Sequence, residues 1–289
     1  MLVPYILLIV LGNLLLRKNK QPVLKSLFIM SFWGLLFAIV IFGINFLIVN
    51  DTFANVTFGV ICLMGLRSLC GAACAFCWLK TLKNIPVSIA DPLFNARMFP
   101  LLFIGWLVFT DPVTTVALVL TVVVFVSCFA LAVFSKQNDE TNKSANYFRG
   151  ILWLALCLCL SLPIVMVARH MGDLGVDTIL FTVISIFFMF VLITIAVFAA
   201  KLNPFKILKE LWNDKLLIVA SIPDNFWVLF YIPLALSMNM GLLDAILLSA
   251  SALTVLAGVV ILKEKVRLFS YLLIAVILGC AVAISLVAT

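Results

Sequence analysis

The chain has 289 residues, of which 66% are hydrophobic and 11% charged, and its formal net charge is +7. Soluble proteins average about 45–50% apolar and about 25% charged residues. One soluble core cannot hide an excess of this size, because the surface would still be apolar. The composition predicts an integral membrane protein and argues against soluble enzymes, nucleic-acid-binding proteins and secreted disulfide scaffolds.

Ten apolar segments follow one another along the chain, and we expect each to be a membrane-spanning helix of about 20 residues. They cover residues 1–16, 24–49, 58–79, 85–109, 114–134, 148–168, 178–200, 216–237, 241–262 and 268–288. The first is short and would span only with support from its neighbours. Because Arg17, Lys18 and Lys20 follow this apolar run instead of preceding it, we expect a retained helix and not a cleaved signal sequence.

The two halves of the chain correspond when the sequence is shifted by 153 positions. The shift places Asp91 on Asp244, Gly105 on Gly258 and Asp111 on Glu264. We therefore predict two five-helix repeats, residues 1–134 and 148–289, joined by a polar linker at 135–147. An odd number of helices per repeat inverts the second half in the membrane, a plan typical of secondary transporters.

Positive charge is distributed unevenly over the predicted loops. Sixteen of the nineteen Lys and Arg residues lie in loops that follow odd-numbered helices, and Arg169 alone follows an even-numbered one. Arg67 and Arg97 lie inside predicted helices. Because cytoplasmic loops carry the excess of Lys and Arg, we expect the linker in the cytoplasm and both termini outside a plasma (inner) membrane.

The segments around Asp111 and Glu264 carry a recognisable pattern. Residues 258–287 read GVVILKEKVRLFSYLLIAVILGCAVAISLV, and residues 105–120 read GWLVFTDPVTTVALVL. Each has a glycine in a helix, then an acidic turn and another apolar helix, which resembles the EamA-type, ten-helix branch of the drug/metabolite transporter superfamily. The resemblance implies a central cavity enclosed by both halves and transport by alternating access. It also implies cytoplasmic termini, whereas the charge count places them outside.

Charged side chains within a span are costly and are candidates for function. The predicted substrate-binding residues are Arg67, Trp78, Asp91, Asn95, Arg97, Asp224, Asn225, Trp227 and Tyr231. The two arginines could bind a carboxylate or a phosphate, and Asp224 could bind an amine or take up a proton. Trp78, Trp227 and Tyr231 could stack on an organic body or a cation. Helical spacing puts Arg67, Gly71, Cys74 and Trp78 on one face, and Trp227 and Tyr231 on another.

The same residues could instead have a purely structural role. Arg67 with Asp224, or Arg97 with Asp91, could form ion pairs that only hold the bundle together. Pro223 could make residues 221–227 an irregular, cavity-lining stretch, or only a packing kink. The triplet Cys70, Cys74 and Cys77 has the form CxxxCxxC, but the single histidine, His170, is remote in sequence. We therefore expect close helix packing here and no metal site.

The leading hypothesis is a secondary transporter for a small polar organic metabolite, such as an amino acid or another zwitterionic or anionic solute. The alternatives are a carrier of a nucleotide-like metabolite or of S-adenosylmethionine, and a lipid head-group flippase on the same fold. No HExxH, GxSxG or Gly-rich phosphate-loop motif is present, so we expect no enzyme, no catalytic residue and no cofactor. The expected partners are a small-molecule substrate and the lipid bilayer, without nucleic acid, for a monomer or a homodimer.

Overall fold

The computed structural model describes residues 2–18, 21–48, 53, 55–135, 144–209, 215–237, 239–262 and 268–287. Within these ranges the chain is almost entirely helical and has no strand, so the predicted all-α class is confirmed. The helices are α1 (Leu2–Lys18), α2 (Val23–Ile48), α3 (Phe58–Asn84), α4 (Val87–Phe94), α5 (Met98–Val108), α6 (Thr115–Ser135), α7 (Ser144–Asp173), α8 (Thr178–Ala199), α9 (Pro204–Lys209), α10 (Lys215–Ser237), α11 (Met240–Leu262) and α12 (Leu268–Val287). A 3-10 turn, η1 (Asn95–Arg97), joins α4 to α5.

Apolar surface on the outside of the bundle identifies a membrane-embedded protein. In the described part of the chain, α2, α3, α7 and α8 are the four helices long and apolar enough to cross a membrane. Large apolar side chains on them are exposed, including Leu47, Leu66 and Ile195. Soluble monomers rarely expose apolar surface on this scale. Each of the ten predicted segments coincides with helix in the described residues, while the number of spans stays a prediction.

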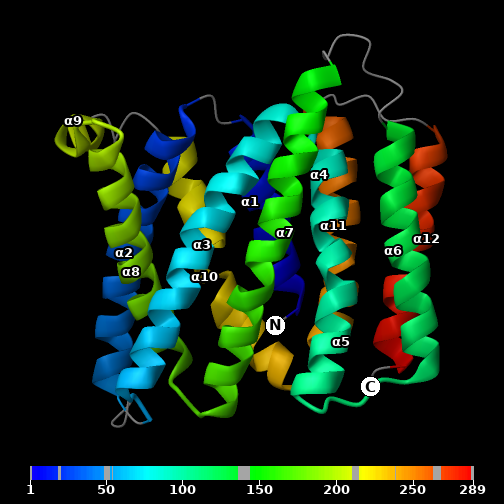
Figure 1. Cartoon of the computed structure of the whole chain (residues 1–289), viewed down its shortest axis with the longest axis horizontal. Coiled ribbons are helices and arrows are strands. Elements are labelled where there is room, and N and C mark those ends of the chain that lie inside the picture. The colour runs from blue at the N-terminus through cyan, green and yellow to red at the C-terminus, as the bar shows by residue number, and fades with distance from the viewer. Residues whose placement is uncertain are drawn as a thin grey trace.

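The helices run alternately up and down between two ends of the bundle (Figure 1). The basic residues at described helix ends gather at one of these ends: Lys18 closes α1, Lys83 lies in the last turn of α3, and Lys215 begins α10. The short helix α9 carries two more lysines at the same end. Arg169 lies near the opposite end, in the last turns of α7. The two ends of the molecule therefore differ strongly in positive charge.

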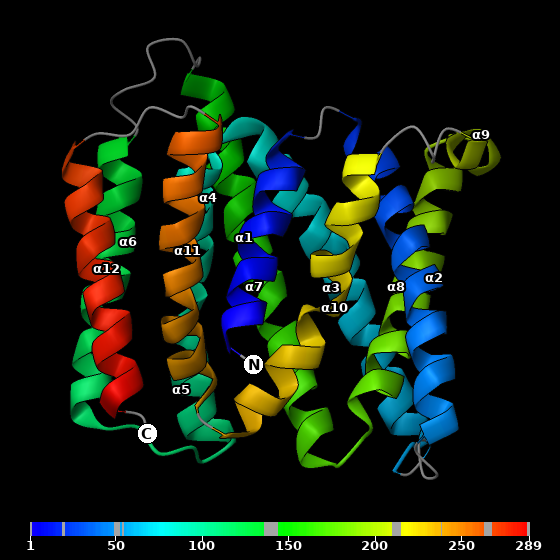
Figure 2. The same ribbon diagram turned by 180° about the vertical axis from the view of Figure 1, so that it is seen from behind.

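Helix α1 is short and central. Its 17 residues extend about 25 Å at a rise of 1.5 Å per residue, less than the roughly 30 Å of a hydrocarbon core. Both views place the N-terminus part-way between the two ends of the bundle (Figures 1 and 2). Helix α1 contacts α3, α4, α10 and α11, so it is supported by neighbours as its length requires.

The fourth predicted helix is broken. Pro92 lies inside α4, where it removes a backbone N–H and clashes with the preceding turn. The chain then tightens into η1 before it continues as α5. The Asn95 side chain stabilises the break, because its Nδ2 donates to the backbone oxygen of Asp91 at 3.0 Å. By contrast α10 continues as helix through 221–227, so the irregular backbone expected there is found at 95–97 instead.

The main helix contacts connect the two halves of the chain. Helix α2 packs on α8, α6 on α12, and both α4 and α5 on α11. Helix α3 packs on α7, and α1 packs on α10. The most extensive apolar core of the described residues lies around Leu82, Ile85 and Val87, where α3 turns into α4 at the lysine-rich end. These contacts leave a cavity between the halves.

Candidate functional site

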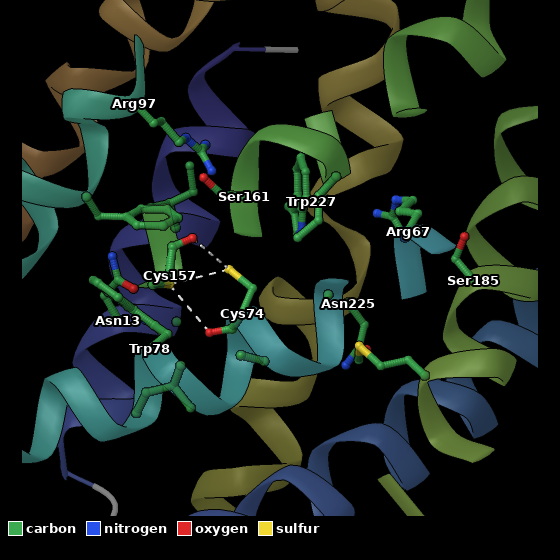
Figure 3. Close-up of a pocket in the computed structure, with 18 of the residues that line it drawn as sticks. Asn13, Arg67, Cys74, Trp78, Arg97, Cys157, Ser161, Ser185, Asn225 and Trp227 are labelled. Carbon is green, nitrogen blue, oxygen red and sulfur yellow. Dashed lines mark hydrogen bonds between the residues drawn. The ribbon is translucent and has the colours of Figure 1, made fainter. Parts of the chain in front are cut away.

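A cavity of about 210 Å³ lies among α1, α3, α4, η1, α7, α8, α10 and α11. Helices from both halves of the chain therefore contribute to its wall. The polar lining residues gather at two ends (Figure 3). Asn13, Trp78 and Arg97 lie at one end, Arg67 and Ser185 lie at the other, and Cys74 and Cys157 lie between them.

Arg97 has its charge neutralised by an acid from the other half of the chain. Its Nε donates to Oδ2 of Asp244 at 2.7 Å, and the Asp244 side chain is completely buried. The guanidinium carbon also lies 4.5 Å from the ring centroid of Phe94, which in turn packs on Trp78 at 5.1 Å. The ion pair and the aromatic stack fix η1 against α11 and α3.

Asp91 is held by the central helix. The Nδ2 atom of Asn13 donates to Oδ1 of Asp91 at 2.7 Å, between α1 and α4. Both side chains are buried, and both line the cavity. Because Pro92 and η1 interrupt the helix, Asp91 and Arg97 face the same cavity although six residues separate them. A regular helix would turn residues six apart away from each other.

Two thiols meet at the middle of the cavity wall. The Sγ atoms of Cys74 and Cys157 lie 3.4 Å apart, and each thiol also contacts the backbone oxygen of the other residue. Both cysteines are free. Among the described residues, no three His, Cys, Asp or Glu side chains are close enough together to hold a metal ion. The pair therefore packs α3 directly against α7.

Arg67 stands at the other end with no counter-ion among the described side chains. Its guanidinium carbon lies 4.9 Å from the ring centroid of Phe181 and 6.0 Å from that of Trp227. No described residue forms a hydrogen bond or an ion pair with it, and its Nε is buried. Ser68, the next residue on α3, donates to the backbone oxygen of Ser185 at 2.9 Å. Two aromatic faces thus flank a positive charge that has no ion-pair partner in the described part of the chain.

Asn225 approaches this end from α10. Its Nδ2 donates to the backbone oxygens of Ser221 at 2.8 Å and Met30 at 3.4 Å, while its Oδ1 is buried without a partner. The side chain fits because residue 34 on α2 is a glycine: a Cβ there would come within 2.5 Å of the amide nitrogen. Small residues allow such close approach between membrane helices.

Seven of the nine residues predicted from the sequence line the cavity. They are Arg67, Trp78, Asp91, Asn95, Arg97, Asn225 and Trp227. Tyr231 is not a lining residue, because it is fully buried in an apolar core with Leu101 and Leu243 and packs edge-on against Trp227. The side chain of Asp224 lies outside the described residues. Of the two alternative ion pairs, Arg97 with Asp91 is not formed, since Arg97 pairs with Asp244, and Arg67 with Asp224 falls outside the described side chains.

Sequence reasoning missed several lining residues. Asn13, Phe94, Cys157, Ser161 and Ser185 all line the cavity and carry no charge. Asn13 had a usable signal, since it is the one strongly polar side chain in the first apolar segment. The serines had none, because a serine inside a membrane helix commonly bonds to its own backbone.

A second polar cluster closes the end of the bundle opposite the lysines. Arg169 at the end of α7 lies 3.3 Å from Asp111 and 3.4 Å from Asp173. Burial raises the pKa of Asp111, and the guanidinium of Arg169 opposes that shift. His170 beside it is exposed. Glu264, the counterpart of Asp111 in the repeat, lies outside the described residues.

Comparison with known proteins gives the fold alone. No family model and no curated protein matches the chain. Twenty-seven chains of solved structures match it. One, described only as "Crystal structure of protein", superposes with a TM-score of 0.68 at 16% identity, over 99% of this chain and 95% of that chain. The arrangement of the whole chain therefore recurs in a solved structure, and this likeness carries no statement about substrate.

Proposed function

We propose that the protein is a secondary transporter that moves a small polar organic solute through the central cavity by alternating access. The observation that carries this proposal is the cavity itself, whose wall has charged side chains from the first half (Arg67, Asp91 and Arg97) and uncharged polar side chains from the second (Ser161, Ser185 and Asn225). Buried charges in a membrane bundle are expensive and mark substrate or ion pathways.

The contacts between helices support two inverted repeats at residues 1–134 and 148–289. If the halves are exchanged, the first five predicted spans map onto the last five. The contact of α3 with α7 then maps onto that of α10 with α1, and the contact of α3 with α8 maps onto that of α10 with α2; both members of each pair occur. The contacts of α2 with α8 and of α6 with α12 map onto themselves. Inverted repeats of this kind underlie many transporters, including the EamA-type family that the sequence resembles.

Cavity size favours a small solute over the larger alternatives. The cavity volume is about 210 Å³. Pockets for drug-sized ligands occupy about 300–1,000 Å³. This volume favours an amino acid or a small organic acid over a nucleotide, S-adenosylmethionine or a phospholipid head group with its glycerol.

Both ends of the bundle have polar contacts that an alternating cycle would have to break in turn. At the lysine-rich end, Arg17 donates to the backbone oxygen of Leu82, and Lys83 donates to that of Gln21. At the other end, Arg169 pairs with Asp111. These contacts tie α1 and its loop to α3, and α7 to the turn after α5, so each is suited to hold one gate closed.

Transport is tested directly with purified protein in liposomes. Labelled amino acids and 2-hydroxy acids should enter protein-containing vesicles with saturable kinetics and should compete with one another. Protein-free vesicles give the background. Movement of labelled phospholipid without solute uptake would support the flippase instead, and a conductance that does not saturate would support a channel.

Membrane orientation follows from the charge asymmetry, and we propose that the lysine-rich end faces the cytoplasm of the cell. A single cysteine at Lys206, exposed on α9, should then be protected in intact cells from a membrane-impermeant maleimide. A cysteine at Leu174, exposed between α7 and α8, should react. Both substitutions need a background without the eight native cysteines, and that unsubstituted background is the control. The reverse labelling pattern would overturn the orientation.

A further inference from the structure

Three buried polar atoms at one end of the cavity lack hydrogen-bond partners. They are Nε of Arg67 on α3, Oγ of Ser185 on α8 and Oδ1 of Asn225 on α10, each without a partner in the described part of the chain. All three residues line the same cavity. Buried polar groups in native proteins are nearly always satisfied. Three exceptions from three helices at one site indicate the position of a ligand.

The charge at this end requires an anion. Arg97 at the far end already has its counter-ion, Asp244, at 2.7 Å. Among the side chains that the structure describes, Arg67 has the faces of Phe181 and Trp227 beside it, at 4.9 and 6.0 Å, and no acidic partner. Aromatic rings attract a cation, but they carry no net charge to neutralise it. The ligand is therefore expected to bring one negative charge to Arg67.

The other two unpartnered atoms, on Asn225 and Ser185, indicate which hydrogen-bonding groups the ligand carries beside its negative charge. The amide of Asn225 has a fixed orientation, because its nitrogen donates to two backbone oxygens, so its Oδ1 is left to accept a hydrogen bond. The hydroxyl of Ser185 is a free donor, since only its backbone oxygen is used, by Ser68. The site thus offers donors from Arg67 and Ser185 and one acceptor from Asn225.

We propose that this end of the cavity binds the carboxylate of a small 2-amino or 2-hydroxy acid; the proposal rests on the transport function above. The carboxylate accepts from Arg67 and Ser185, and the neighbouring amino or hydroxyl group donates to Asn225. A guanidinium matches a planar carboxylate in a bidentate fork. A doubly charged phosphate would need a second free cation, and the other arginine of the described wall is already paired. The aliphatic body then lies along Ile186 and Met189.

Equilibrium binding to the purified full chain tests the proposal, with four probes of one carbon skeleton. L-leucine and 2-hydroxy-4-methylpentanoate should both bind and raise the melting temperature. 4-Methylpentanoate, which lacks the donor for Asn225, should bind about tenfold more weakly, and L-leucinamide, which lacks the anion, should not bind. L-alanine and lactate repeat the comparison of an amino acid with a hydroxy acid, on a shorter side chain.

Matched variants separate a binding role from a structural one. Arg67→Met should weaken L-leucine binding by about ten- to hundredfold. It should also raise, or leave unchanged, the melting temperature of the ligand-free protein, because it removes an uncompensated buried charge. If Arg67 only held the bundle together, that temperature would fall. Gly65→Ala, two residues earlier on α3 and with no atom within 4 Å of the new Cβ, should leave binding unchanged.

Several results would overturn the subsite. They are equal binding of the acid and its amide, full affinity in Arg67→Met, or no binding of any standard amino acid or of the two hydroxy acids. Liposome flux of other solutes that is insensitive to Arg67→Met would keep the transport function and remove the subsite. Arg67-dependent binding without any flux would keep the subsite and remove the transport function.

Discussion

Replacing Arg97 by methionine should lower the free energy of unfolding by about 3–5 kcal/mol, because the change leaves a buried carboxylate without its counter-ion. The Asp244 side chain has no solvent exposure, and that of Arg97 has 12%. In this desolvated setting the 2.7 Å contact offsets the cost of keeping both charges out of water. Chemical unfolding in mixed micelles gives the measurement.

The double substitution Arg97→Met with Asp244→Leu is the decisive control. It removes both charges and keeps similar side-chain volume, so we expect most of the lost stability to return, and even a gain. A single variant Asp244→Leu should be destabilising on its own, because Arg97 then loses this counter-ion. If the double variant were as unstable as the two singles added together, the loss would come from packing and not from charge.

The sequence predicts well where the structure is regular. The predicted face of α3 lines the cavity at all four of its residues, Arg67, Gly71, Cys74 and Trp78. This helix has no proline and continues without interruption from Phe58 to Asn84. A period of 3.6 residues per turn is then enough to place side chains on one face.

Prediction fails where partners come from distant parts of the chain. The repeat identified Asp244 as the counterpart of Asp91, but it could not show that Asp244 pairs with Arg97, 147 residues away. That contact depends on how η1 rotates Arg97 toward α11 after Pro92. Local spacing carries no information about this rotation, because it is set by packing against the other half.

Uncharged polar residues are the other group whose roles cannot be predicted from the sequence. Thr182, Ser185 and Thr194 on α8 look alike in sequence, yet the two threonine hydroxyls donate to backbone oxygens one turn back and Ser185 does not. Tyr231 shows the opposite error, since it shares a helix face with Trp227 but lies one turn farther along, beyond the cavity and inside an apolar core. Only the three-dimensional boundary of the cavity separates these cases.

Gly150→Ala on α7 should lower the free energy of unfolding by about 1–3 kcal/mol, the usual cost of overpacking a dense interior. A Cβ at this position would lie 2.4 Å from Cγ1 of Ile85 and 3.0 Å from Cβ of Asn84. Ile85 is fully buried in the main apolar core, so it cannot rotate away. Helix α7 would have to move off α3 and carry Cys157 with it.

The corresponding substitution Gly65→Ala on α3 should instead raise the free energy of unfolding. No atom lies within 4 Å of a Cβ there, and alanine stabilises a helix interior by about 1 kcal/mol relative to glycine. Measuring both variants side by side in micelles removes the contribution of helix propensity, which is common to them. Because Cys157 and Ser161 follow Gly150 on α7 and line the cavity, solute binding should weaken in Gly150→Ala alone. Equal stability changes in the two variants would mean that close contact between α7 and the α3–α4 corner does not hold the cavity wall in place.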